Sequence, residues 1–186
     1  MSTHDRNDST NARGTNGSNE HKFLTFCLGS EHFGVEILRV REIIGLIAIT
    51  PLPQTPPYVK GVMNLRGRII QVIDLRQRFG LSAADATKET CVVVLEAAND
   101  DGSQTVMGAV VDSVREVQDI PPSAIEPPPE FGCEIPLKYI LGMGKLKDRV
   151  VVLLEIAEVI GMRERAQIAG AIKDSASAGL AERRAA

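Results

Sequence analysis

The sequence has no tryptophan, two tyrosines and five phenylalanines, so aromatic residues make up only 4% of its 186 positions. Because 44% of the residues are nevertheless hydrophobic, the core must be mostly aliphatic. Valine and isoleucine together supply 33 positions. Branching at Cβ restricts a side chain in a helix and suits a pleated, half-buried surface. The composition therefore favours β-structure.

Cysteines and long apolar runs are also scarce. Cys27, Cys91 and Cys133 are odd in number and far apart, which predicts neither a disulfide framework nor a metal site. The first two lie in apolar stretches, where a cysteine is usually a small buried hydrophobe, as in a reducing cytoplasm. The longest stretch without a charge, 43–59, contains four prolines, whereas a membrane span needs about 20 apolar residues. We therefore expect a soluble cytoplasmic protein, with no secretory signal in the polar segment 1–20.

An excess of positive charge is missing as well. The net charge is −3 and the isoelectric point is about 5.7, which argues against a protein that binds nucleic acid. Four arginines lie within 13 residues of one another: Arg66, Arg68, Arg76 and Arg78. The first two flank a predicted turn and the last two fall on a short predicted helix, so they need not converge on a phosphate. A solvated or partner-facing set is the favoured interpretation.

The residue sets that carry catalysis are absent from the sequence. His32 lies beside a predicted turn, and the other two histidines lie at or before position 21. No Gly-x-Ser-x-Gly, His-Glu-x-x-His or Cys-x-x-Cys motif occurs. Asp74 and Glu155 occupy matching places at the ends of predicted strands, where a carboxylate caps the helix that follows. We expect no enzyme activity, no cofactor and no metal.

What the sequence does contain is an internal repeat. Residues 58–80 align without gaps on 139–161, with five of 23 positions identical, and the only two tyrosines pair with each other. Upstream, Val-Arg-Glu-Ile at 40–43 recurs as Val-Arg-Glu-Val at 114–117. A third apolar block, 23–28, matches 91–96 in the same order. Three ordered matches indicate a duplication.

Each half predicts the same series of short strands, with a proline-rich loop, a hairpin and a short helix that stops at a glycine. Gly67 suits the positive φ of a tight hairpin turn at 66–67. The strand 68–74 is apolar on both faces, so we expect it to be covered on both sides; Ile70 and Val72 lie on one face, and Ile69 and Ile73 on the other. The predicted fold is all-β, with two small packed barrels, short helices and disordered tails.

The repeat also predicts the domain organisation. We expect a disordered tail at 1–22, a structured domain at 23–161 and a C-terminal helix or tail at 162–186. The halves of the structured domain run roughly over 23–89 and 90–161. Strands are free to swap between the two barrels.

Several segments resemble the CheW family of chemotaxis coupling proteins. Phe-Gly-Val-Glu-Ile at 33–37 and Val-Arg-Glu-Ile at 40–43 are similar to the opening of CheW domains. Lys-Gly-Val-Met-Asn-Leu-Arg-Gly at 60–67 resembles the most characteristic segment of the family, and 108–114 and 146–154 are similar to its second half. The resemblance covers about 139 of the 186 residues. The resemblance implies that 23–161 is a CheW-like domain.

The resemblance implies a fold and a function. Family members fold as two SH3-like five-stranded β-barrels around a shared core. They are non-enzymatic adaptors that couple transmembrane chemoreceptors to a chemotaxis histidine kinase, so that kinase activity follows receptor state. The implied partners are the regulatory domain of the kinase, which has the same fold, and the cytoplasmic tip of the methyl-accepting receptors. Such a protein would be recruited to receptor arrays at the inner membrane and would touch the membrane only through receptors.

The resemblance also implies a set of contact residues. Glu42 and Arg66 match positions implicated in receptor or kinase contacts, with no assignment between the two. The expected partner-binding residues are Val40, Glu42, Ile43, Gly61, Val62 and Arg66. Core packing explains Val40, Ile43 and Val62 equally well. The alternative function is a small-barrel nucleic-acid-binding protein, which the acidic isoelectric point disfavours.

Overall fold

The computed structural model describes residues 19–98, 102–129 and 135–161, and the expected tails fall largely outside these ranges. Residues 19–22, which the sequence predicts as part of the N-terminal tail, form a short 3₁₀ helix, η1 (Asn19–His21), and the first residue of β1 (Lys22–Leu28). The backbone holds them there, because Ile120 donates an N–H to the His21 carbonyl oxygen at 2.8 Å. The structured domain therefore begins slightly earlier than predicted.

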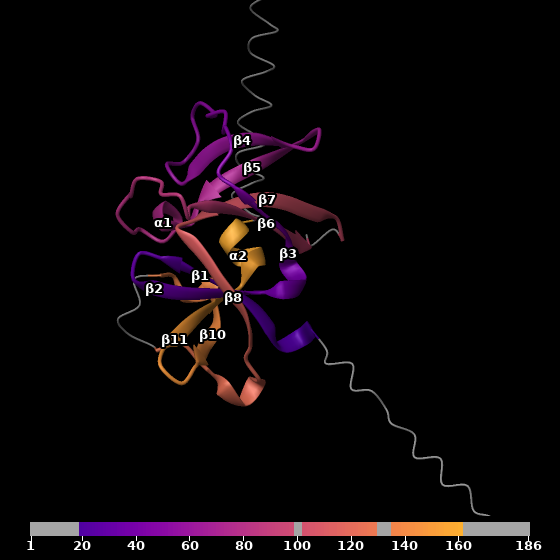
Figure 1. The fold of residues 1–186 in the computed structure, drawn as a ribbon. Coiled ribbons are helices and arrows are strands. Elements are labelled where there is room, and N and C mark those ends of the chain that lie inside the picture. The colour runs from indigo at the N-terminus through magenta and orange to yellow at the C-terminus, as the bar shows by residue number, and fades with distance from the viewer. Residues whose placement is uncertain (1–18, 99–101, 130–134, 162–186) are drawn as a thin grey trace, which may run out of the picture.

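The described residues form two sheets (Figure 1). Sheet one has the strand order β3 (Val40–Gly45), β6 (Cys91–Ala98), β7 (Gln104–Val111), β5 (Arg68–Asp74), β4 (Val59–Leu65). Sheet two has the order β8 (Ser113–Asp119), β1, β2 (Glu31–Glu36), β11 (Val150–Leu154), β10 (Ile140–Lys145), β9 (Ile125–Glu126). The prediction of an all-β fold with short helices is confirmed: the described residues are mostly strand, arranged in these two sheets. Sheet two has a sixth strand because the proline-rich stretch contains the two-residue β9, which the sequence did not predict.

Each sheet combines strands from both halves of the sequence. Sheet one takes β3, β4 and β5 from the first half and β6 and β7 from the second. Sheet two takes β1 and β2 from the first half and the remaining strands from the second. The chain crosses between the sheets at η2 (Ile37–Arg39) and again at Asp112. Strand pairing between the halves is parallel at β5–β7 and at β2–β11.

Two short α-helices close the two halves. α1 (Leu75–Arg78) follows β5, and the Asp74 carboxylate caps it by accepting the backbone N–H groups of Arg76 and Gln77. α2 (Ile156–Ile160) follows β11, and the Glu155 carboxylate accepts the N–H of Ala157 at 3.2 Å. The predicted capping roles of both carboxylates are therefore confirmed. Two further 3₁₀ turns, η3 (Pro122–Ala124) and η4 (Leu137–Tyr139), precede β9 and β10.

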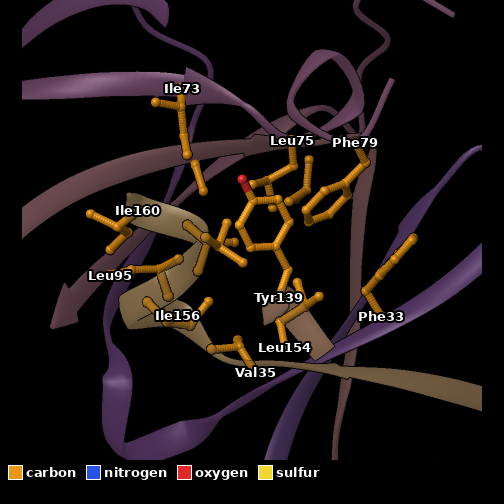
Figure 2. Packing of buried hydrophobic residues seen from close by; sticks show 14 of the residues in the cluster. Phe33, Val35, Ile73, Leu75, Phe79, Leu95, Tyr139, Leu154, Ile156 and Ile160 are labelled. Carbon is orange, nitrogen blue, oxygen red and sulfur yellow. The ribbon is translucent and has the colours of Figure 1, made fainter. Parts of the chain in front are cut away.

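The hydrophobic core has a central cluster between the sheets and a smaller cluster on the far side of each sheet. Val93 and Leu95 of β6 belong to the central cluster, while Val92 and Val94 belong to the cluster of sheet one. Because successive side chains of a strand point to opposite faces, a strand between two clusters must be apolar on both faces. Figure 2 shows the central cluster, where Tyr139 lies beside residues from both sheets and from both α-helices.

The expectation that both faces of 68–74 are covered holds for only part of the strand. Ile70, Val72 and Ile73 are buried, but Ile69 is 67% exposed. Pairing of β5 with β7 begins at Gln71, so Ile69 lies beyond the neighbouring strand, near the tip of the hairpin. The prediction was therefore wrong for Ile69, because it ignored where the adjacent strand ends.

Replacing Phe33 with alanine should destabilise the whole domain. Phe33 is fully buried and its ring stacks on Phe26 at 5.8 Å and on Phe79 at 5.6 Å between ring centroids. Truncation of a buried phenylalanine costs about 3–5 kcal/mol, and the central cluster joins both sheets. Urea unfolding of Phe33→Ala should show this loss in one transition. A loss below about 1 kcal/mol, the size of a tolerated volume-conserving core change, would contradict the packing described.

Candidate functional site

The β4–β5 hairpin presents Arg66 on a fixed turn. Arg66 and Gly67 both have positive φ, at 51° and 86°, as the two central residues of a type I′ turn require. The Asn64 Oδ1 accepts the N–H of Gly67 at 2.7 Å and fixes the turn from one side. The predicted turn at 66–67 is confirmed. The Arg66 side chain projects from it with 80% of its surface exposed.

Arg66 reaches the strand at the opposite edge of sheet one. Its Nη2 donates to the Glu42 Oε2 at 2.8 Å. Glu42 lies on β3 and Arg66 follows β4, which are the two edge strands of the sheet. The structure therefore brings together the two residues that carry the site prediction, although 24 positions separate them. An Arg–carboxylate pair with its cation in solvent can exchange one carboxylate for another at low cost.

Aliphatic side chains are exposed on the same two elements. Ile43, the neighbour of Glu42, is 45% exposed, and Ile69 of the hairpin is 67% exposed. Leu46 and Ile47, which continue the chain after β3, are 42% and 43% exposed. Sequence reasoning missed Leu46, Ile47 and Ile69. Leu46 and Ile47 could have been found from the sequence, because they lie in an apolar segment that has neither the helical nor the strand periodicity of a core element.

Leu46 and Ile47 also line a pocket. Its volume is about 370 Å³, and its other walls include Lys60, Asp74 and Arg76. The charged groups of these walls pair with one another or with close neighbours, since Lys60 lies 3.9 Å from Asp74 and Arg76 pairs with Asp112. Asp85 also lines the pocket, so it is an amphipathic hollow in which Lys60, Asp74 and Arg76 are already paired within the chain.

The other predicted contact residues have structural contacts. Val40 is partly buried and packs against the central cluster. Val62 exchanges two backbone hydrogen bonds with Thr50, each 2.8 Å long. Gly61 is buried with φ +136°, and a Cβ there would lie 2.0 Å from the Thr50 carbonyl oxygen. These contacts within the chain are enough to explain why valine, valine and glycine stand at the three positions. That Val40, Val62 and Gly61 also touch a partner stays a prediction.

Sheet two carries a related ion pair. The Arg149 Nη2 donates to the Glu116 Oε1 at 3.1 Å, and Val117 and Val150 beside them are 48% and 50% exposed. Glu116 is the repeat counterpart of Glu42, so the alignment of 40–43 with 114–117 pointed to it. The arginine, however, comes from the other side of the turn, because Arg149 aligns with Arg68 and not with Arg66.

A bidentate ion pair on the outer face of sheet one gives a pH prediction. The Arg41 guanidinium donates to the Glu96 carboxylate at 2.7 and 2.5 Å. These hydrogen bonds hold the pKa of Glu96 below its usual range, and nearby Arg39 and Arg68 act in the same direction. The pair is therefore present at neutral pH and is lost only as the pH falls through this lowered pKa.

Replacing Arg41 with glutamine should raise the pKa of the Glu96 carboxyl group towards about 4.3, the ordinary value for glutamate. Side-chain carboxyl NMR shifts followed against pH would measure it. Arg39→Gln, which removes a nearby charge that makes no hydrogen bond to Glu96, should move the pKa of Glu96 much less. An identical pKa of Glu96 in the parent and in Arg41→Gln would contradict the contact.

Within the described ranges, no three His, Cys, Asp or Glu side chains gather as a metal site would require. The Cys27 Sγ lies 3.4 Å from the His32 Nδ1 and 3.3 Å from the Arg115 Nε, but only 5% of Cys27 is exposed. Burial raises the pKa of the Cys91 thiol. Cys27 is buried as predicted, whereas Cys91 is only partly buried against the central cluster, and both fit a packing role better than that of nucleophiles.

Comparisons with known proteins agree on one family. The family described as "CheW-like domain" matches residues 22–164. The chain is 37% identical over 147 residues to the chemotaxis protein CheW of Klebsiella aerogenes, covering 79% of this chain and 86% of that protein. It is 32% identical over 151 residues to CheW of Rhizobium meliloti, covering 81% and 93%.

A solved structure is also similar. The scaffolding protein TtCheW from Thermoanaerobacter tengcongensis superposes with a TM-score of 0.67 at 33% identity, covering 74% of this chain and 85% of that one. In the part of the chain that the structure describes, every helix is too short or too polar to cross a bilayer.

Proposed function

The chain belongs to the CheW-like family, and from this premise we propose that it is a non-enzymatic adaptor of chemotaxis-type signalling. It couples transmembrane chemoreceptors to a chemotaxis histidine kinase, so that the activity of the kinase follows the state of the receptors. Its partners are the regulatory domain of the kinase and the cytoplasmic tip of the receptors. It works in the cytoplasm, at receptor arrays on the inner membrane.

The observation that carries this proposal is the exposed Glu42–Arg66 pair between the two edges of sheet one. Charged groups beside aliphatic surface give a protein interface its register and specificity, while the aliphatic groups give affinity. Ile43 and Ile69 supply such surface on the same elements. This combination suits a reversible contact between proteins.

The arrangement also suits a helical or barrel-shaped partner better than a nucleic acid. Arg66 is paired with a carboxylate of its own chain, and the neighbouring Arg41 is paired with Glu96. Because phosphate binding requires cations in excess, a surface whose arginines are largely neutralised favours a protein partner.

The experiment that tests the proposal is autophosphorylation of a chemotaxis histidine kinase in the presence of receptor-bearing membranes, with and without the purified chain. We expect kinase activity to respond to receptor ligand only when the chain is present. The chain should also sediment with the receptor–kinase assembly. If it neither alters the activity nor sediments with the assembly, the proposed coupling role is wrong.

A further inference from the structure

α1 follows sheet one, and its first arginine contacts both its own loop, where the Arg76 Nε donates to the Ser82 carbonyl oxygen at 2.9 Å, and the link between the two sheets at Asp112. The Arg76 Nη1 donates to the Asp112 Oδ2 at 2.5 Å, and only 18% of the Arg76 side chain is exposed. The same Asp112 oxygen accepts the N–H of Gly29, in the β1–β2 turn, at 2.6 Å. Arg76 is thus tied through one carboxylate to the turn between the first two strands of sheet two.

The second arginine of α1 reaches the helical segments α2 and η4, which follow and precede strands of sheet two. The Arg78 Nε donates to the Val159 carbonyl oxygen of α2 at 3.1 Å. Its guanidinium carbon lies 4.3 Å from the ring centroid of Tyr58 and 5.0 Å from that of Tyr139. Tyr58 precedes β4 of sheet one, whereas Tyr139 precedes β10 of sheet two. The cation therefore lies between an aromatic ring from each side, an arrangement that is favourable once partly desolvated.

The repeat gives these contacts a particular position. Tyr58 aligns with Tyr139, and Arg78 aligns with Val159, the residue whose carbonyl oxygen it contacts. Residues that touch their own repeat counterparts lie where the two halves meet. Two arginines at that place would repel each other, whereas the pair Arg78 and Val159 places a single guanidinium beside both tyrosines. Arg76 and Arg78 of α1 align with Ala157 and Val159, so the two halves differ in charge at the place where they meet.

From these contacts we infer that Arg76 and Arg78 are positioning residues that fix the orientation of sheet one relative to sheet two. The apolar contacts of the central cluster hold the sheets together, but the hydrophobic effect is not directional and permits sliding. Hydrogen-bonded charges are directional and set register. The sequence favours a solvated or partner-facing role for both arginines, and their contacts within the chain correct that interpretation.

The consequence for signalling rests on the proposed function. Glu42 and Arg66 belong to sheet one, so their direction relative to any contact made by sheet two depends on how the sheets are fixed. An adaptor with a loose junction could still bind each partner separately. It would transmit the state of one partner to the other less well, because coupling requires that both sites act on the same rigid arrangement.

The test measures distances between spin labels by pulsed electron resonance, in a background with the three native cysteines changed to alanine. One label pair joins Gln104 of sheet one to Lys147 of sheet two, and a control pair joins Gln104 to Ile69 within sheet one. All three positions are exposed. The test variant is Arg76→Gln with Arg78→Gln. The matched control is Arg68→Gln, an exposed arginine without an ion pair among the described residues.

We expect the distance distribution between the sheets to lose its narrow single peak in the double variant and to stay unchanged in Arg68→Gln. The distribution within sheet one should be the same in all proteins. A folded double variant with the parent distribution between the sheets would overturn the inference, even if its melting temperature fell. If the double variant does not fold, the same distances are measured in Asp112→Asn, which removes only one charge. A parent distribution between the sheets in that variant would likewise overturn the inference.

Assays of binding and of kinase control distinguish a failure of this inference from a failure of the proposed function. Binding to kinase alone and to receptor alone should persist in the double variant, while receptor control of the kinase falls roughly fivefold or more, the usual size of a coupling between sites. Loss of separate binding would overturn the positioning role. If the parent chain itself confers no receptor control, the proposed function fails, and the distances between labels still decide the inference.

Discussion

Arg66→Glu should abolish most receptor control of the kinase while leaving the fold intact. The substitution reverses the charge of a side chain that is 80% exposed and places a second carboxylate beside Glu42. Like charges in an interface cost several kcal/mol, and each 1.4 kcal/mol is about tenfold in affinity. An exposed ion pair itself contributes only about 0–1 kcal/mol to folding. Coupled autophosphorylation should therefore fall at least about tenfold, while the melting temperature changes by only a few degrees.

Lys147→Glu is the matched control for this variant. Lys147 aligns with Arg66 at the turn of the second half, is exposed, and undergoes the same reversal of charge. We expect it to keep coupling. A double variant that exchanges the charges, Glu42→Arg with Arg66→Glu, restores the pair within the chain but not the charge offered to a partner. Normal coupling by Arg66→Glu at normal expression would show that this pair is not the contact surface.

Gly61→Ala should unfold the domain at a much lower temperature than the parent. The residue has φ +136°, a conformation that side chains with a Cβ rarely adopt, and the new Cβ would lie 2.0 Å from the Thr50 carbonyl oxygen. Backbone strain and overpacking each cost about 1–3 kcal/mol. A loss on the order of 3 kcal/mol corresponds to a drop of roughly 6–12 °C for a chain of this size.

Gly45→Ala makes the same chemical change at a position where a Cβ would meet nothing within 4 Å. Its stability should remain within about 0.5 kcal/mol of the parent, as for most surface changes. The comparison also bears on the predicted contact role of Gly61. If Gly61→Ala is as stable as the parent yet fails in coupling, Gly61 belongs to the interface and not to the fold.

Local features of the fold were predictable because their causes lie close together in sequence. The turn at 66–67 follows from Gly67, and the caps follow from a carboxylate placed just before each helix. The apolar character of both faces of 68–74 predicted a strand covered on both sides, and Ile73 in the central cluster with Ile70 and Val72 in the cluster of sheet one confirm it for that part of the strand. These inferences need only the backbone preferences and the alternation of side chains along a strand.

Features that depend on which strands lie side by side could not be predicted from the sequence in the same way. The exposure of Ile69 depends on β5 extending past β7, and the Glu42–Arg66 contact depends on the two edges of sheet one approaching each other. The partners of Arg76 and Arg78 lie in the other half of the sequence. The order of strands sets all three, and the repeat alone does not specify that order.

The exchange of strands between the halves has a consequence for synthesis on the ribosome. Sheet one needs nothing beyond β7, which ends at Val111, so its five strands are available while the chain is still being made. Sheet two pairs β2 with β11, which ends at Leu154. β1 and β2 must therefore wait, with apolar faces uncovered, until most of the chain has been translated. β1 and β2 can pair with each other early, but their uncovered apolar faces and open outer edges invite aggregation. Slowing translation after residue 111 should therefore lower the yield of folded protein more than slowing it before residue 40.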